Sequence, residues 1–232
     1  MGTIEISIFP EKIFEIFNLP ITGTFFLSLI LGAFLFFLFF FGLKTAPGRL
    51  RAFSEWVLES FLNYIEGVVG EKGKAKEIFP LVCTLFLFIL FANLLEILPG
   101  VGVFHFFRSP SSDLSFTLPL AIFSMGYIHF HAIQKLGLFS HLKKFLNFKN
   151  PILFFVGILE GISQIVRTFS LAIRLFGNLF AGEILLIVTS RLFPFLLPLP
   201  FLLLEIFVSF IQALIFSTLV AIFYAVETTK AE

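Results

Sequence analysis

The sequence predicts an all-α integral membrane protein with about five transmembrane helices and one amphipathic helix along the membrane surface. Hydrophobic residues make up 58% of the 232 residues and charged residues only 13%, whereas a water-soluble domain carries about 25% charged residues. Several apolar runs reach the roughly 20 residues that a helix needs to cross a hydrocarbon core. The net charge of +1 indicates no nucleic-acid partner.

The first part of the chain predicts one span followed by a surface helix. Thr22 to Leu43 carries no charge and is long enough to cross the bilayer. A basic turn with Pro47 and Gly48 ends this span. Leu50 to Val69 mixes three glutamates with apolar residues at helical spacing, which predicts a helix lying along the membrane, because a span would bury the glutamates. We expect Gly70 to Lys76 to be a polar loop.

The remaining sequence predicts longer helices toward the C-terminus. Ile78 to Leu98 and Phe116 to Gln134 are each apolar enough for a span. Pro151 to Ser190 has no internal proline and would extend roughly 60 Å as one helix, about twice the hydrocarbon core. It is therefore either one steeply tilted or bent helix or two spans. Phe201 to Val226 predicts the last helix, and Glu227 to Glu232 a polar tail.

Residues 1–232 are expected to form a single membrane domain in three parts: residues 1–77, residues 78–149 and residues 150–232. With the N-terminus outside, most of the 16 lysines and arginines lie inside, as the positive-inside rule requires. Only Lys12, Arg108 and Arg191 then fall outside. This predicts an outside N-terminus and an inside C-terminus, but charge does not choose between one helix and two in the long segment.

A polar stripe runs along the segment that begins at Glu160 and reads EGISQIVRTFSLAIRLFGNLFAGE. At about 100° per residue, six polar residues fall within an arc of roughly 80° on an otherwise apolar helix. They are Glu160, Ser163, Arg167, Ser170, Arg174 and Asn178. An arginine at the centre of a membrane helix costs roughly 2.5 to 3.5 kcal/mol on insertion scales. The stripe must therefore face protein or water, and we expect it to be functional.

Arg174 is the first candidate for a residue that acts directly in the function of the chain. Its guanidinium does not lose its proton at accessible pH, so it is a fixed positive charge and a poor proton carrier. A carboxylate on a partner protein would be ionised beside Arg174 and neutral once it moved into lipid. Arg174 would then act as a gate between two water-accessible routes. The residues alone leave a static ion pair within the chain equally open.

The last predicted helix carries a second polar face. Glu205, Ser209 and Gln212 follow spacings of 4 and 3 in an apolar segment, so they share one side of a helix. In an antiparallel arrangement, Gln212 would lie near Arg174. Glu183, by contrast, lies about 180° around its helix from Arg174, so it faces another wall of the structure.

One motif carries a family resemblance. Its residues are Ser170-Leu171-Ala172-Ile173-Arg174-Leu175-Phe176-Gly177-Asn178, followed by Ala181-Gly182-Glu183. This motif resembles the signature of the a subunit of F-type ATP synthases, the membrane stator of a rotary motor. The resemblance covers about Phe79 to Thr228 and is weak before that. It implies two long, strongly tilted C-terminal helices that pack as a hairpin against the rotor ring, with the ion pathway in residues 150–232.

The resemblance also implies a role for each polar residue. Arg174 would face the carboxylates of the rotor c-subunit ring, with Gln212 beside it. Asn178, Glu183 and Glu205 would line an outer half-channel, although the family often has one histidine at the last two positions. The inner route would be lined by Glu160, Ser163, Arg167 and Ser170, where the family usually has Lys-Pro at 167 and 168. Glu96 resembles a family acid on the outer side, and Asp113 is expected at the same mouth or as a solvated loop acid.

The function implied by the resemblance is that of a non-catalytic stator that couples proton flow to rotation and ATP synthesis. Its partners would be the c-ring, the peripheral-stalk b subunits, the F1 sector indirectly and the lipid bilayer. Its location would be a bacterial plasma (inner) membrane. Sodium coupling is an open alternative. A secondary transporter with an intramembrane arginine is the main rival, but it predicts internal repeats, which the sequence lacks.

The sequence contains no phosphate-binding glycine loop, HExxH or CxxC motif. We therefore expect no cofactor, no metal site and no ATP chemistry in this chain. His129 and His131 are two residues apart, so on a helix they point to different sides and do not bind a metal together. A structural role is expected for both.

Overall fold

The structure is a computed structural model that describes residues 12–16, 19–45, 48–97, 109–138, 151–193 and 196–229. The chain forms two compact units, each built from three separate segments. The first unit comprises Met1–Ala46, Leu87–Thr117 and Leu175–Ala213, and the second comprises Pro47–Phe86, Leu118–Arg174 and Leu214–Glu232. Their boundaries fall inside the long helices, so each of those helices contributes to both units. Lys143, Lys144, Lys149 and Lys230, which the positive-inside rule places inside, lie outside the described residues, as does Arg108.

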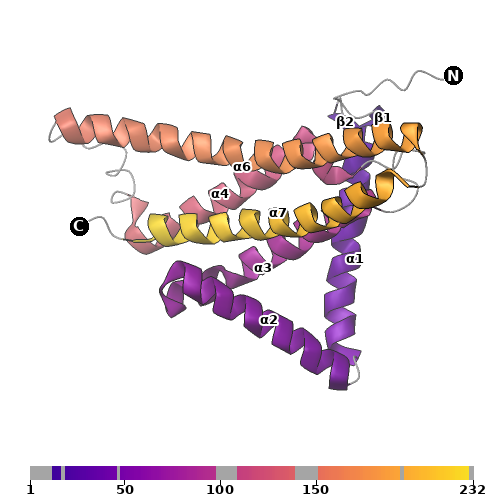
Figure 1. Ribbon diagram of the computed structural model, residues 1–232. Coiled ribbons are helices and arrows are strands. Elements are labelled where there is room, and N and C mark those ends of the chain that lie inside the picture. Colours follow the sequence, from indigo (N-terminus) through magenta and orange to yellow (C-terminus); the bar gives the residue numbers. More distant parts are fainter. Residues whose placement is uncertain are drawn as a thin grey trace. The chain divides into compact units, whose positions relative to one another are not determined.

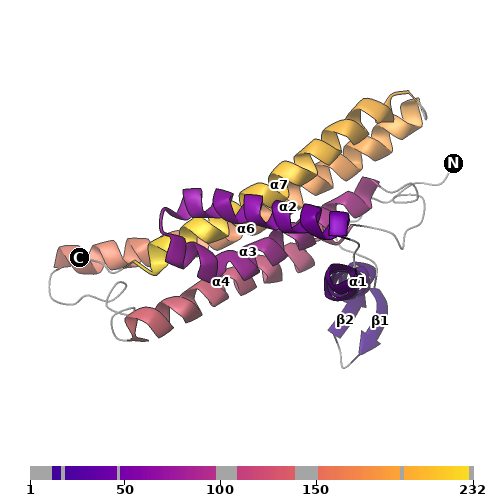
Figure 2. The same ribbon diagram turned by 90° about the horizontal axis from the view of Figure 1, so that it is seen from below.

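The first unit begins with a small β-hairpin that leads into a helix (Figure 2). Strand β1, Lys12–Ile16, pairs antiparallel with β2, Leu19–Thr22. Helix α1, Gly23–Thr45, follows directly and confirms the first predicted apolar helix. The sequence predicts an all-α chain and misses the hairpin, because strands of five and four residues are too short for periodicity to identify.

The second unit begins with the predicted amphipathic helix, α2, Gly48–Val69. Phe53 and Trp56 are exposed, whereas Ile65 is fully buried. The Phe61 ring stacks on the ring of Phe86 in the following helix, with centroids 4.8 Å apart. One face of α2 is thus packed on protein and the opposite face carries exposed aromatic rings, as a helix at a membrane surface requires.

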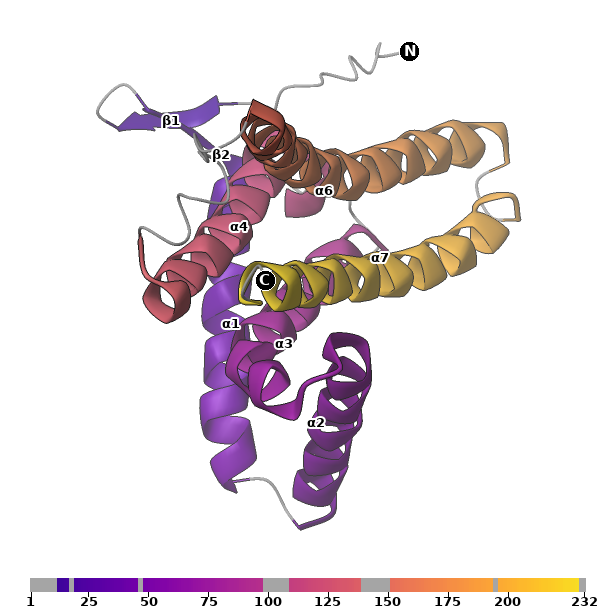
Figure 3. The ribbon, with the colours of Figure 1, turned by 90° about the vertical axis from the view of Figure 1, so that its left-hand side faces the viewer.

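Helix α3, Lys72–Leu94, starts earlier than the sequence analysis predicts. The expected loop from Gly70 to Lys76 is wrong, because the chain reverses at Gly70, whose φ is +76°, and is helical again from Lys72 (Figure 3). Lysine, alanine and glutamate are good helix formers, and Lys74 forms an ion pair of 2.8 Å with Glu71. These local preferences extend the helix beyond its apolar part.

The remaining helices agree with the predicted order. Two short 3-10 helices, Leu95–Ile97 and Pro110–Ser112, lie before α4, Leu114–Leu136. Helix α6, Pro151–Leu192, is one uninterrupted helix of 42 residues (Figure 1). This settles the open choice in favour of one helix instead of two. Helix α7, Pro198–Glu227, includes Glu227, which the sequence analysis assigns to the polar tail.

Four helices in the described part of the chain are long and apolar enough to cross a membrane. They are Lys72–Leu94, Leu114–Leu136, Phe154–Leu192 and Pro198–Glu227. The described apolar part of α1, Gly23–Phe39, is shorter. Helix α2 is not among the candidates, which fits its predicted position at the membrane surface. The chain is a helical, multi-pass membrane protein.

In the first unit, Asp113 fixes the start of α4 to the start of α1. One carboxylate oxygen accepts a hydrogen bond from the Ser115 backbone N–H at 2.9 Å, which caps the N-terminus of α4. The other accepts the Thr24 hydroxyl of α1 at 2.8 Å. Asp113 is only 2% exposed. The acid is therefore a buried structural link and not the solvated loop acid that the sequence left open.

We predict that Asp113→Ala lowers the free energy of unfolding in detergent micelles by about 2 kcal/mol, because it removes an N-cap and a hydrogen bond to a charged group. Asp113→Asn should retain most of the stability, since asparagine caps helices about as well as aspartate. Thermal or denaturant unfolding of both variants checks this. Equal losses in the two variants would contradict the capping role.

Candidate functional site

Arg174 lies on a face of α6 that the described part of its own unit leaves exposed. Its side chain is exposed, and so are the neighbouring Phe169 and Ile173, at 49% and 56%. Ser170 and Asn178, one turn away on either side, are exposed as well. No described side chain of its own unit forms a hydrogen bond or ion pair with the guanidinium. The described part of that unit therefore offers no static ion pair for Arg174.

In the first unit, α6 and α7 run antiparallel and bring predicted residues together. The Asn178 Nδ2 atom donates a hydrogen bond of 3.0 Å to Gln212 Oε1. The Gln212 side chain is 2% exposed, so the bond holds one polar group buried and the other at the open face. This contact joins one residue of the polar stripe of α6 to one residue of the polar face of α7.

Gly182 and Glu205 form the next contact between the same helix segments. A Cβ atom at position 182 would lie 2.6 Å from Cδ and 2.8 Å from Oε2 of Glu205, and closer still to Oε1. Glu205 is only 5% exposed, and Glu183, beside Gly182, is half-buried. A larger residue at position 182 would require the Glu205 carboxyl group to move.

Further buried polar atoms line α3 and α7 in the first unit. Asn93 Nδ2 donates to the Ser209 carbonyl oxygen at 3.4 Å, and both side chains are fully buried. Asn93 Oδ1 and Ser209 Oγ have no hydrogen-bond partner among the described residues. Buried polar atoms of this kind are satisfied by internal water. Glu96 lies in the 3-10 helix Leu95–Ile97, and its side chain is outside the described part.

The second unit brings together the other end of the polar stripe. Arg167 NH1 lies 3.4 Å from Glu160 Oε1, and its guanidinium lies over the Phe223 ring of α7, 5.5 Å from the centroid. Gln164 Nε2 donates to Glu160 Oε1 at 3.2 Å and also to Glu227 Oε1. Ser163 is half-buried on the same helix. Of the residues predicted for this half, Glu160 and Arg167 therefore belong to a charged cluster with Gln164 and Glu227.

Sequence reasoning misses Gln164 and Glu227 in this cluster. Gln164 lies about 40° beyond the edge of the polar stripe on an ideal helix, so a slightly wider arc would have included it. Glu227 follows Glu205 by 22 residues, which places it within about 40° of the polar face of α7. The spacing thus places Glu227 on the polar face, but the sequence analysis assigns Glu227 to the tail because the apolar run ends at Val226.

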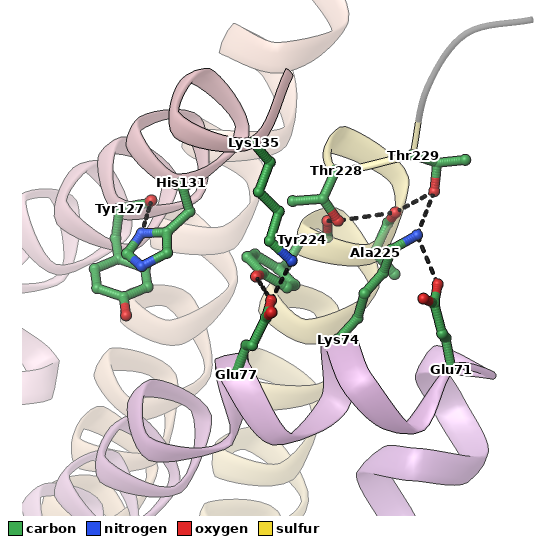
Figure 4. A network of polar contacts seen from close by, with 10 residues as sticks. All are labelled: Glu71, Lys74, Glu77, Tyr127, His131, Lys135, Tyr224, Ala225, Thr228 and Thr229. Carbon is green, nitrogen blue, oxygen red and sulfur yellow. Dashed lines mark hydrogen bonds and ion pairs between the residues drawn. The ribbon is translucent and has the colours of Figure 1, made fainter. Parts of the chain in front are cut away.

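The C-terminal end of α7 is held by a polar network in the second unit (Figure 4). The Tyr224 hydroxyl donates to Glu77 Oε2 at 2.6 Å, and Lys135 of α4 pairs with the same oxygen. The Lys74 ammonium donates to Thr229 Oγ1 at 3.1 Å. Tyr224 is fully buried. These contacts fix the last turn of α7 against α3 and α4.

His131 contributes aromatic contacts to this network. Its ring stacks on Tyr127, with centroids 4.2 Å apart, and meets the edge of Tyr224 at 6.4 Å. Its Nδ1 atom lies 3.2 Å from the Tyr127 carbonyl oxygen. Across the described residues, no group of three or more histidine, cysteine or acidic side chains is placed to hold a metal ion.

Comparisons with known proteins identify the family. A family model described as the ATP synthase A chain matches residues 24–225. This chain belongs to that family. It is 38% identical over 184 residues to ATP synthase subunit a of Geobacter sulfurreducens, covering 78% of this chain and 75% of the relative. It is 36% identical over 186 residues to ATP synthase subunit a 1 of Syntrophotalea carbinolica, covering 79% and 74%. For ATP synthase subunit a of Campylobacter jejuni the identity is 33% over 193 residues, covering 82% and 81%.

Membership in the a-subunit family confirms the resemblance that the motif around Arg174 carries. The chain has the role of the proton-translocating stator subunit in the membrane sector, Fo, of an ATP synthase. Its long apolar helices fit a multi-pass membrane subunit.

We predict that Gly182→Ala lowers ATP-driven proton pumping per assembled ATP synthase by about tenfold, because the added methyl group displaces the Glu205 carboxyl group and overpacking costs about 1 to 3 kcal/mol. Gly126→Ala on α4 is the matched control, since a Cβ there meets nothing within 4 Å. Pumping in membrane vesicles checks both. Equal pumping by the two variants would show that the close approach of Gly182 to Glu205 does not affect proton pumping.

Proposed function

We propose that Arg174 is the gate of the proton pathway and faces the carboxylates of a rotor c-subunit ring. The exposed face of α6 around Arg174 supports this, because a permanent cation surrounded by exposed apolar side chains requires a partner that carries the opposite charge. A ring carboxylate is favoured in its ionised form beside Arg174 and in its neutral form in lipid. Each passing acid therefore releases its proton at Arg174 and takes up another before it re-enters lipid.

A gate of this kind needs two separate routes for protons, and the polar residues of α6 and α7 supply both. We assign the outer half-channel to the first unit and the inner half-channel to the second unit. The outer route comprises Asn178, Glu183, Glu205, Gln212 and Glu96. The inner route comprises Glu160, Ser163, Arg167 and Ser170. The orphaned polar atoms of Asn93 and Ser209 support a hydrated outer route, since buried water would satisfy them.

The guanidinium also prevents protons from passing directly between the two routes. Because Arg174 does not release a proton at accessible pH, it does not relay one, and a proton must leave on a ring subunit. Proton movement is then coupled to rotation. The membrane potential contributes roughly 2.3 kcal/mol per charge per 100 mV, so several protons are needed for each ATP formed on other subunits of the complex.

Membership in the family also indicates which subunits the chain assembles with and where it lies. An a subunit assembles with other subunits of Fo and F1, and we assign the c-ring and the peripheral-stalk b subunits as its direct partners. The distribution of lysine and arginine supports an outside N-terminus and an inside C-terminus in a bacterial plasma membrane. The chain itself is non-catalytic, and ATP chemistry takes place on other subunits.

We predict that Arg174→Ala abolishes ATP-driven proton pumping by the reconstituted ATP synthase, because ring acids no longer meet a fixed positive charge. Arg191→Ala is the matched control, as Arg191 is an exposed arginine in the last turn of the same helix, and it should retain pumping. Pumping is measured as acidification of proteoliposomes, normalised to assembled complex. Unimpaired coupled pumping by Arg174→Ala would refute the gate.

We predict that Glu183→Gln slows proton transport by about tenfold, less than the roughly hundredfold or more that one acid–base group usually contributes, while the complex still assembles. Glu59→Gln on the exposed face of α2 is the control and should have wild-type transport. The measurements are the pumping rate and the amount of a subunit that co-purifies with the complex. Lost assembly in Glu183→Gln would recast Glu183 as a structural residue.

A further inference from the structure

A buried acid closes the polar cluster of the second unit. Glu227, the last residue of α7, is 3% exposed, although the sequence suggests a solvated tail. Its Oε1 atom accepts a hydrogen bond from Gln164 Nε2. The same nitrogen donates to Glu160 Oε1 at 3.2 Å. Two carboxyl groups from two helices therefore share a single amide donor.

The described charged groups near this pair include Arg167 of α6 and Lys74 of α3. On α6, Arg167 NH1 lies 3.4 Å from Glu160. On α3, the Lys74 ammonium is engaged with Glu71 at 2.8 Å and with Thr229 at 3.1 Å. The described contacts thus place two acids on the Gln164 amide and one guanidinium beside Glu160. Neighbouring acids that share a site hold a proton between them more readily than separated acids do.

The Gln164 amide fits both protonation states of the pair. Gln164 is 6% exposed, and its Oε1 atom has no hydrogen-bond partner among the described residues. With Nε2 toward the acids, the amide donates to ionised carboxylates. A half-turn of the amide presents Oε1 instead, which accepts a hydrogen bond from a protonated acid. A buried acceptor without a partner is unfavourable, and the second orientation gives Oε1 a partner.

We propose that Glu160, Gln164 and Glu227 form a proton-exchange site of the inner half-channel, with Glu227 as a further proton-carrying residue. The proton leaves a carboxyl oxygen of Glu227, which becomes a carboxylate, and binds a carboxylate oxygen of Glu160, which becomes the acid. No other bond changes. The Glu160 side chain is 38% exposed, so it exchanges the proton with water, whereas Glu227 stores it away from water. This inference rests on the half-channels proposed above.

The alternative is that Glu227 only ties α7 to α6 through the Gln164 amide. A glutamine at position 227 keeps the size and a hydrogen-bonding oxygen but carries no proton, whereas an aspartate keeps the acid and withdraws it by one methylene. The proton-exchange role thus requires Glu227→Gln to be defective and Glu227→Asp to work. A purely structural link favours the variant of the same size, Glu227→Gln.

The test is ATP-driven proton pumping by the complete ATP synthase in inverted membrane vesicles, normalised to assembled complex. Glu227→Gln should lower the rate at least about fivefold, a modest part of the usual contribution of an acid–base group, while Glu227→Asp keeps at least about half of it. Glu71→Gln, an exposed acid near the same end of α7, should pump as the wild type does. The inference is overturned if Glu227→Gln stays within about twofold of wild type, or if Glu227→Asp is as slow as Glu227→Gln.

Dependence of the rate on the pH of the vesicle medium, which bathes the inner side, gives a second readout. The pH dependence of pumping by Glu227→Asp should be shifted from that of the wild type, because the shorter side chain places its carboxyl group differently against Gln164. An unchanged pH dependence overturns the inference even if Glu227→Gln fails to assemble. The two proposals fail separately. If Glu227→Gln pumps like the wild type and Arg174→Ala does not pump, the exchange site is refuted and the gate proposal stands. If Arg174→Ala pumps, the gate proposal is refuted.

Discussion

The cost of placing charge in hydrocarbon is the constraint on which this protein depends. A long apolar helix tolerates an ionisable residue only where protein or water meets it. Helix α6 carries Glu160, Arg167, Arg174 and Glu183 within an otherwise apolar sequence. The arrangement of α7 and the exposure of α6 both follow from where those groups find partners.

The two compact units meet this constraint with the same pair of antiparallel helices. In the first unit, Asn178 binds Gln212 and Gly182 admits the Glu205 carboxyl group. In the second unit, Gln164 bridges to Glu227 of α7. In each contact, a polar group on one helix meets either a polar group on the other helix or the space beside a glycine. The helix pair thus forms two polar regions, one in each unit.

The sequence predicts most of the helical elements because hydropathy and charge determine them directly. It does not choose between one and two helices for the long segment, since two helices would move only Arg191 and Lys230 across the membrane and leave the charge bias almost unchanged. It places a loop at Gly70 to Lys76, because lysines interrupt the apolar pattern although they favour helix. It also misses the hairpin before α1, whose strands are too short to show a period.

The polar site shows the same division between what periodicity predicts and what packing decides. The shared face of Glu205 and Gln212 is a property of one helix, so spacing alone predicts it. The burial of Glu227 depends on contacts among helices far apart in sequence. Tyr224 binds Glu77, and Lys74 binds Thr229, and these bonds hold the last turn of α7 where Gln164 meets it. No local pattern encodes such contacts.

Arg174 differs from the other charged groups of α6 in a way that carries the functional argument. Arg167 has Glu160 and the Phe223 ring as neighbours, so its charge is partly balanced inside its own unit. Arg174 is exposed beside Phe169 and Ile173 instead. If it had only a structural role, folding would favour a partner acid on the same chain, because an uncompensated cation in hydrocarbon costs several kcal/mol. The second unit supplies such an acid to Arg167, so the helix pair can balance an arginine. The exposure of Arg174 therefore supports the proposal that another subunit supplies the compensating negative charge.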